Sequence, residues 1–256
     1  MVSRRVQVLV IAITAFMAAR NVHSQTPAKI NPPASQPKKP ETFLHKLLRI
    51  SGIAASPSTL KGPGDEVVSG QVWLVEVASQ KPKSLSSEGG YSSPVFAQSG
   101  GSIFALHGTD VVRLDLSGGN AQKVCSIPDI QKLVGTSQDD TDKVLILRSG
   151  SSKNSAVGLL SVGTGKIEEL PYDPASSEDR QVFEHLRGWD RVYGDKSVFV
   201  KRQNKQSLSG PVQWTDVFLK DGTNQPVNVS ACDEVNCGQP SLSPDGKLLV
   251  FIRAQN

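Results

Sequence analysis

The feature that most restricts the fold of this chain is an internal repeat. The segment 239–252 reads Gln-Pro-Ser-Leu-Ser-Pro-Asp-Gly-Lys-Leu-Leu-Val-Phe-Ile. The segment 91–106 follows the same plan of a short strand, a turn rich in serine and glycine, and an apolar strand. A chain that repeats one supersecondary unit is usually a repeat architecture, in which neighbouring copies bury a shared core. The repeat therefore indicates a scaffold more clearly than it indicates a chemistry.

The turn of the last copy consists of Ser243, Pro244, Asp245 and Gly246. Proline presets φ, the aspartate side chain can accept a hydrogen bond from the nearby backbone, and glycine tolerates a positive φ, so the turn predicts a β-hairpin. The second strand of each hairpin is a continuous apolar run, which is typical of a strand covered on both faces. These runs are 102–106, 144–147, 198–200 and 248–252.

The segments between the hairpins predict two further strands per repeat, because each has a turn in its middle. They are 110–120, 156–166 and 214–224, and a fourth one at 71–77 comes first with no hairpin before it. Pairing the first two strands of the chain with the last two would complete one sheet and close a ring, which removes most exposed sheet edges. We therefore predict an all-β fold, a β-propeller of about four blades in which the N- and C-terminal strands share one blade.

Residues 243–251, Ser-Pro-Asp-Gly-Lys-Leu-Leu-Val-Phe, resemble the WD40-like (PD40) repeat of the periplasmic TolB-type propellers. The resemblance spans residues 67–255 and is weakest in the two middle repeats, where 138–142 and 193–195 stand in the place of the turn. It implies a propeller that binds proteins in the cell envelope. TolB-type propellers normally have six blades, so three possibilities stay open: a closed four-bladed ring, an arc completed by another copy, or a remnant of a larger propeller.

The N-terminus predicts export. Residues 1–24 begin with a basic segment around Arg4 and Arg5, continue with an apolar run of 14 residues, 6–19, and end with small residues at a plausible cleavage point. This is the pattern of a cleaved signal peptide, and the run is too short to span a bilayer. A retained N-terminal anchor is the alternative. We expect a periplasmic or secreted protein with no transmembrane segment after signal removal.

Three further regions follow the predicted signal. Residues 25–40 are rich in proline and poor in apolar side chains, which predicts a disordered linker. Residues 41–52 have the spacing of a short amphipathic helix, which would pack on the propeller, or else dock on a partner or a membrane surface. The propeller domain is expected at 67–256.

The net charge of +4 gives no support for nucleic-acid binding. Arg4, Arg5 and Arg20 belong to the predicted signal, and removing them leaves +1. The predicted linker carries three lysines and no acid, so the remainder has a charge of −2. Binding of nucleic acid would need a basic face on the folded domain.

The three cysteines suggest one local disulfide. Cys232 and Cys237 are close together in Ser-Ala-Cys-Asp-Glu-Val-Asn-Cys-Gly. In an exported protein this spacing favours a disulfide, which in the loop-entropy model stabilises by about 2 kcal/mol. A metal site would want more cysteines or histidines than this cluster provides. Cys125 is interpreted as a packed thiol.

Several fragments invite a chemical interpretation, and a structural one is favoured for each. The segment 163–166, Gly-Thr-Gly-Lys, resembles the end of a phosphate-binding loop, but Ile167 follows where serine or threonine should hold magnesium, so a β-turn is expected. The acidic segment 138–142 lacks the spacing of a calcium loop. His107 and His185 would have to meet across the ring to form a metal site. Trp73, Trp189 and Trp214 are expected to pack between strands.

We therefore expect a non-enzymatic propeller that needs no cofactor and binds another envelope or secreted protein. The alternative from another class is a propeller hydrolase with an acidic, metal-dependent central site. Its first candidate residues are Asp110, Asp139, Glu184 and Asp216. Nothing in the sequence specifies the oligomeric state or the identity of the partner.

Overall fold

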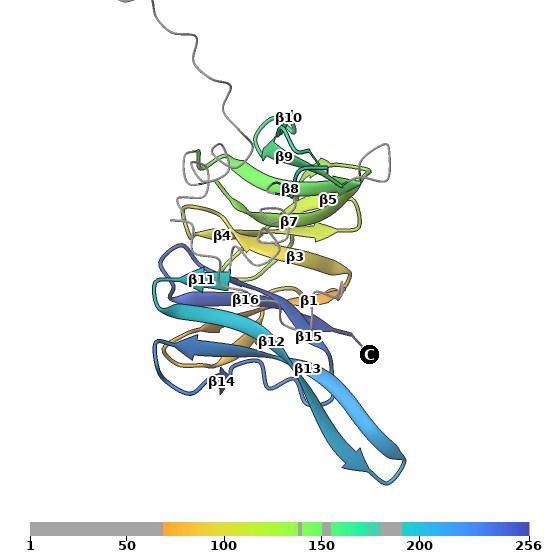
Figure 1. Ribbon diagram of the computed structural model, residues 1–256, viewed down its shortest axis with the longest axis vertical. Coiled ribbons are helices and arrows are strands. Elements are labelled where there is room, and N and C mark those ends of the chain that lie inside the picture. Colours follow the sequence, from red (N-terminus) through yellow and green to blue (C-terminus); the bar gives the residue numbers. More distant parts are fainter. Residues whose placement is uncertain are drawn as a thin grey trace, which may run out of the picture. The chain divides into compact units, whose positions relative to one another are not determined.

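The computed structural model describes residues 69–137, 140–149, 155–173, 175–177, 179 and 191–255. The chain divides into two compact units, 1–39 and 40–256, and every described residue belongs to the second. This described part contains β-strands paired in antiparallel sheets, as predicted (Figure 1). The predicted signal peptide, linker and amphipathic helix lie outside the described residues.

One sheet joins strands from the beginning and the end of the described region. Strand β1 (Gly70–Glu76) pairs along its whole length with β16 (Leu248–Ala254), from Gly70 opposite Ala254 to Glu76 opposite Leu248. On the other side of β16 lies β15 (Cys237–Leu242), and β2 (Pro82–Ser84) pairs with β1. The pairing of the first predicted strands with the last ones is therefore confirmed.

The remaining strands form three consecutive quartets, each a four-stranded antiparallel meander. The first consists of β3 (Tyr91–Phe96), β4 (Ser102–His107), β5 (Asp110–Asp115) and β6 (Gln122–Ser126). The second consists of β7 (Ile130–Thr136), β8 (Lys143–Ser149), β9 (Ser155–Ser161) and β10 (Ile167–Glu169). The third consists of β11 (Val192–Tyr193), β12 (Lys196–Ser207), β13 (Gly210–Asp221) and β14 (Val227–Asn228). A single bridge between Gly70 and Tyr91 also links β1 to β3.

The apolar runs are buried on both faces because their alternate residues enter different cores. In β16, Val250 and Ile252 pack against the β3–β6 quartet, whereas Leu249 and Phe251 pack against the β11–β14 quartet. The second strands of two other quartets, β4 and β8, divide their side chains in the same way. This arrangement explains why these strands lack the alternation of a half-exposed sheet.

Strand β12 departs from this pattern. Val198 and Val200 are buried against the sheet that joins the chain ends, but Phe199, between them, is partly exposed. The expectation that the run 198–200 is covered on both faces is therefore wrong for one of its faces. On the other face of the β11–β14 quartet Phe199 and Phe218 are partly exposed, whereas Asp216 is buried.

Core contacts show which sheets pack against each other. The quartet β7–β10 packs on β3–β6, which packs on the sheet of β1 and β16, which in turn packs on β12 and β13. Within the described residues, the strands of β7–β10 have no extensive contact with those of β11–β14. Closure of a ring between these two quartets stays a prediction.

Candidate functional site

The most unusual element of the described structure is the hairpin formed by β12 and β13. Each strand has 12 residues, and the two pair without interruption from Lys196 opposite Asp221 to Ser207 opposite Gly210. The flanking strands are much shorter, with two residues each. The outer part of the hairpin, residues 201–216, is consequently a two-stranded ribbon that extends away from the other sheets (Figure 1).

The ribbon is polar along its strands and apolar at its tip. The side chain of Leu208, in the two-residue loop, is fully exposed. Isolated two-stranded ribbons are at best marginally stable in water. A single exposed leucine is common on protein surfaces, so Leu208 counts as a candidate contact only together with the rest of the ribbon.

The ribbon is also basic. Between residues 199 and 215 the chain contains Lys201, Arg202 and Lys205 and no acidic residue. Lys205 makes an exposed ion pair with Glu234, with 3.0 Å between Nζ and Oε1. A one-signed strip of charge would attract a partner of opposite charge.

Aromatic side chains lie where the ribbon leaves the sheet. Phe199 and Phe218 are opposite each other and stack, with ring centroids 5.9 Å apart. The ammonium group of Lys201 lies 5.4 Å from the centre of the Phe218 ring. Both rings are partly exposed, so this group offers apolar surface next to a cation.

Asp216 anchors the base of the ribbon. Its side chain is buried, and each carboxylate oxygen accepts two hydrogen bonds. Oδ2 accepts from Trp214 Nε1 and Asn228 Nδ2, both at 3.0 Å, while Oδ1 accepts from Ser230 Oγ at 3.0 Å and from the Cys232 amide at 2.8 Å. A buried carboxylate needs such donors to offset its lost hydration. The geometry therefore gives Asp216 a structural role.

Three of these donors come from the segment after β13, which continues into a loop closed by the Cys232–Cys237 disulfide, in agreement with the predicted pairing. The same loop covers the edge of β13. Ser230 Oγ accepts a 2.8 Å hydrogen bond from the Val217 amide, and Asn236 Oδ1 accepts one of 3.1 Å from the Thr215 amide. The disulfide thus stabilises the support of the ribbon.

The other acids proposed for a hydrolase are not brought to Asp216 by any described contact. Asp110, on β5, accepts a 2.5 Å hydrogen bond from Ser126 and pairs with Lys123 at 2.9 Å. These two partners hold the pKa of Asp110 below its ordinary value. Asp139 and Glu184 lie outside the described residues. Among the described residues there is no group of three or more side chains that could hold a metal ion.

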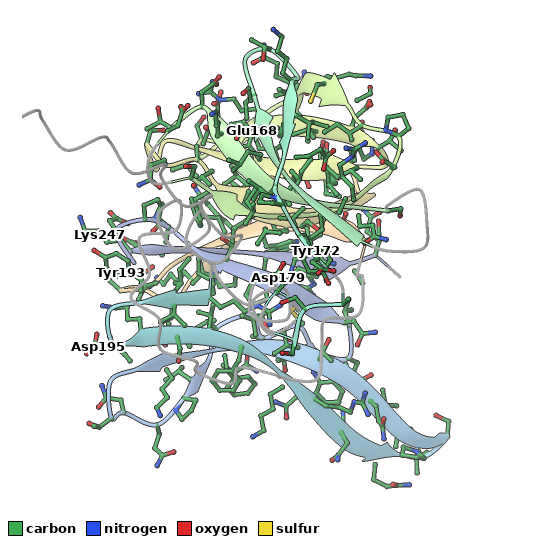
Figure 2. The ribbon with its side chains drawn as sticks, turned by 45° about the horizontal axis from the view of Figure 1, so that its top comes forward. Glu168, Tyr172, Asp179, Tyr193, Asp195 and Lys247 are labelled. Carbon is green, nitrogen blue, oxygen red and sulfur yellow. A yellow bond between two sulfur atoms is a disulfide. The ribbon has the colours of Figure 1, made fainter. Side chains whose placement is uncertain are left out.

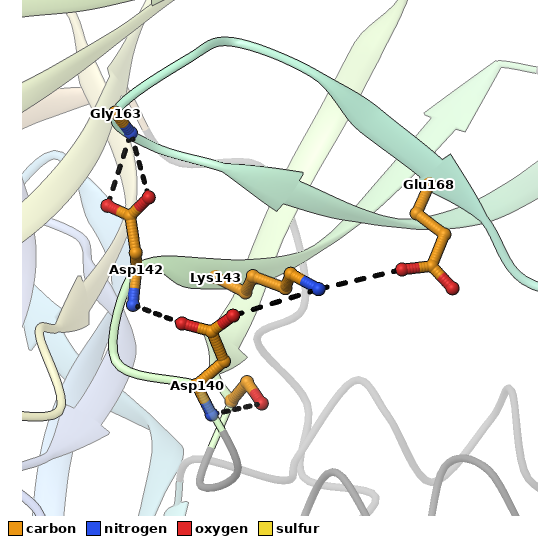
Figure 3. A network of polar contacts seen from close by, with 6 residues as sticks. Asp140, Asp142, Lys143, Gly163 and Glu168 are labelled. Atoms are coloured by element: carbon orange, nitrogen blue, oxygen red, sulfur yellow. Dashed lines mark hydrogen bonds and ion pairs between the residues drawn. The ribbon is translucent and has the colours of Figure 1, made fainter.

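The acidic segment before β8 forms a hydrogen-bonded turn (Figure 3). Asp142 accepts hydrogen bonds from the Gly163 amide at 3.2 and 3.3 Å, and its own amide donates to Asp140 Oδ1 at 3.1 Å. Lys143 Nζ lies 3.7 Å from Asp140 Oδ2 and 3.6 Å from Glu168 Oε2, so it forms ion pairs with both carboxylates. The contacts of these carboxylates hold two neighbouring turns together.

The remaining fragments also have structural contacts. The segment 163–166 is the turn between β9 and β10, with Gly165 at φ 69°. The rings of His107 and Tyr91 stack with their centroids 4.8 Å apart. The guanidinium carbon of Arg253 lies 4.9 Å from the centre of the Trp73 ring. Cys125 is a partly buried thiol whose pKa is raised, mainly by burial. His185 and Trp189 lie outside the described residues.

The turn of the last repeat is closed by hydrogen bonds. The Gly246 amide donates to the Ser243 carbonyl at 2.8 Å, and Ser243 Oγ donates to Asp245 Oδ1 at 2.7 Å. Gly246 has φ 65°, which favours glycine. Tyr193, from the preceding quartet, packs against Gly246 and lies on the same side of the structure as Lys247 (Figure 2).

The sequence did not reveal the ribbon. Its outer residues lack both the apolar alternation and the continuous apolar run that indicate a strand. The available signal was the segment Ser207-Leu208-Ser209-Gly210-Pro211, which has the composition of a turn between two polar stretches of equal length. Trp214 and Asp216 were noted as candidates, and a spacing of two residues puts both on one face of a strand. The donors from Asn228, Ser230 and Cys232 meet Asp216 only in the folded chain.

Comparison with known proteins gives weak likenesses. No protein-family model matches the chain, and no curated protein matches it. A protein assigned as TolB from Agrobacterium tumefaciens has 16% identity and a TM-score of 0.35, over 71% of this chain and 60% of that one. TolB from Acinetobacter baumannii has 12% identity and a TM-score of 0.31, over 89% and 72% of the two chains.

A third solved structure, the apo form of the isopeptidase AtxE2, has 16% identity and a TM-score of 0.26, over 53% of this chain and 25% of that one. The chain thus spans less than two thirds of the length of the Agrobacterium protein and a quarter of the isopeptidase. Likenesses with TM-scores this low do not bear on function. In the part of the chain that the structure describes, no helix is long and apolar enough to cross a membrane.

Proposed function

We propose that this protein is an exported, non-enzymatic β-propeller that binds another envelope or secreted protein through the β12–β13 ribbon. The observation that carries the proposal is the hairpin of β12 and β13. Its strands have 12 residues each, their neighbours have two, and the leucine at its tip is fully exposed. The inner part of the hairpin supplies buried residues such as Val198 and Val217, whereas its outer part, the ribbon, adds little to the core. Its exposed apolar and basic groups suit contact with another chain.

The three quartets, together with the sheet of β15, β16, β1 and β2, are the blades of the proposed propeller. The pairing of β1 with β16 supports this assignment, since a sheet built from both chain ends leaves fewer strand edges exposed. In the proposed closed form, the accessible face of β12 and β13 would be near β7–β10. In an open arc, that face would remain available.

Export is supported by two features. The predicted signal peptide at 1–24 would direct the chain across a membrane. The Cys232–Cys237 disulfide is of a kind that persists in oxidising compartments and is rare in the cytosol.

The proposal is tested by photo-crosslinking in the cells that export the protein. A benzoylphenylalanine at position 208 places the reactive group at the ribbon tip, and the same residue at position 120 serves as the control, because Asn120 is an exposed turn residue on another quartet. We expect one discrete adduct from position 208 that position 120 does not give. Equal labelling from both positions, or none from position 208, would contradict a docking role of the ribbon.

A further inference from the structure

The outer edge of β12 is the longest unpaired strand edge in the described part of the chain. Strand β13 pairs with all 12 residues of β12, whereas β11 pairs only with Lys196 and Ser197 on the other side. No described strand pairs with residues 198–207 on that side. Such a row of backbone amides and carbonyls is a template for an added strand.

The opposite edge of the ribbon is less suited to strand addition. Near its base, β13 is covered by β14 and by the loop that contains Ser230 and Asn236. Closer to the tip it contains Pro211, which has no amide hydrogen to donate. Strand addition on this hairpin is therefore favoured at β12.

The charge along this edge indicates what the added strand would contain. Lys201, Arg202 and Lys205 are exposed on β12. Lys205 pairs with Glu234, and Asp216 lies opposite Lys201 in the register of β12 and β13. An incoming segment with acidic side chains would gain from these charges, and a basic segment would be repelled.

Apolar groups lie at both ends of the basic stretch. Phe199 and Phe218 are partly exposed at its base, and Leu208 is fully exposed at the tip. A strand advances about 3.3 Å per residue, so an occupant of eight to ten residues, roughly 30 Å long, would reach both ends. The matching pattern is acidic in the middle and apolar at its ends.

We propose that the outer edge of β12, residues 199–207, binds an extended acidic segment of the partner protein as an added β-strand. This inference rests on the proposed function, and it adds the chemistry and the geometry of binding. Lysines on an edge strand can also serve only to prevent aggregation between edges. The experiment below separates that protective role from binding.

The probe is a labelled synthetic peptide of about ten residues that alternates glutamate with threonine and valine and ends in leucines. A second peptide has glutamine in place of each glutamate, and a third has the acidic sequence with alternate backbone amides methylated. We expect fluorescence anisotropy with the full exported chain to show that the acidic peptide binds on the order of ten-fold more tightly than either other peptide. Equal binding of the acidic and glutamine peptides, or of the methylated and unmethylated ones, would overturn the proposal.

Two matched charge reversals locate the site. Arg202→Glu lies in the middle of the proposed edge, and Lys166→Glu makes the same change of net charge at an exposed turn of another quartet. We expect Arg202→Glu to weaken binding of the acidic peptide on the order of ten-fold, and Lys166→Glu to leave it unchanged. Similar losses in both variants would show a general charge effect and would contradict a site on β12.

Competition separates this inference from the function on which it rests. If the acidic peptide suppresses the adduct formed from position 208, the partner uses the β12 edge as proposed. If the adduct forms and saturating peptide leaves it unchanged, the strand-addition proposal is wrong although the ribbon still binds a partner. If neither adduct nor peptide binding is observed, both proposals are wrong.

Discussion

The backbone amide of Ser93 donates a 2.6 Å hydrogen bond to Oε1 of Gln239, although the two residues are separated by 146 positions in the chain. Each is the residue before the proline of its repeat, Pro94 or Pro240, and each interrupts the ladder of its hairpin at a bulge. Both also have a positive φ, 49° and 52°. The repeat seen in the sequence is thus a repeat of backbone conformation, and its copies bond to each other.

This hydrogen bond stabilises the contact between two sheets. Gln239→Ala leaves the buried Ser93 amide without its acceptor and should lower the free energy of unfolding by about 1 to 3 kcal/mol. Ser93→Ala keeps the amide and should cost much less. Urea denaturation of the two variants measures the difference, and equal losses would show that the bond contributes nothing measurable.

The turn glycines of the two clear repeats form a matched pair. Gly100 and Gly246 have φ of 70° and 65°, but a methyl group at Gly100 would meet open space, whereas one at Gly246 would overlap the ring of Tyr193. Gly100→Ala should therefore cost about 1 to 2 kcal/mol from backbone strain alone. Gly246→Ala should lower the free energy of unfolding by more than this, because its methyl group would also overlap the Tyr193 ring.

Tyr193→Ala tests the origin of that difference. In this background Gly246→Ala and Gly100→Ala should have similar effects on the thermal midpoint, because the ring that distinguishes the two sites is gone. In the chain that keeps Tyr193, the two alanine substitutions should lower the thermal midpoint by different amounts. Equal falls would mean that the Tyr193 ring does not restrain the turn.

Asp216 distinguishes the binding scaffold from the hydrolase. In Asp216→Asn the amide group would face two donors that now bond to a carboxylate oxygen, so we expect a loss of about 2 to 4 kcal/mol in the free energy of unfolding. Asp110→Asn, at an exposed carboxylate, is the control and should cost far less. A metal-dependent turnover that Asp216→Asn abolishes without loss of stability would favour the enzyme instead.

The repeat turn should be sensitive to acid. Hydrogen bonds from Ser243 and from the Lys247 amide lower the pKa of Asp245 below its ordinary value. A carboxyl group whose pKa is lower in the folded state stabilises the fold above its unfolded pKa, and this contribution is lost as the pH falls through the folded pKa. Asp245→Asn should therefore destabilise the protein at pH 7.

The acid series supplies the check on that expectation. Below about pH 4 the aspartate becomes protonated in the unfolded chain, so the difference between the variant and the unmodified protein should shrink. Urea midpoints measured from pH 7 down to pH 3 follow this difference. A gap that stays constant over the series would contradict a role for the ionised carboxylate.

The sequence predicted the parts of the fold that depend on local chemistry. Turn residues such as Gly246 and the continuous apolar run ending at Ile252 placed the last hairpin. The order of the strand pairs along the chain predicted that the two chain ends share a sheet. The ribbon was missed because its residues between Lys201 and Ser207 are polar on both faces, and strand formation there depends on the partner strand. Asp216 was noted as a candidate acid, but its four donors come from residues 214 to 232 and meet only in the folded chain.

The central claim, that the ribbon is the docking element, is tested most directly by shortening it. Residues 204–213 would be replaced by Asn-Gly, so that Gln203 and Trp214, which are opposite each other, are joined by a two-residue turn and Trp214 keeps its hydrogen bond to Asp216. Crosslinking of both proteins in the exporting cells, with thermal unfolding as the control for folding, gives the measurement. We predict that the shortened protein unfolds as cooperatively as the full chain and loses the partner adduct. A folded, shortened protein that still forms the same adduct would contradict the claim.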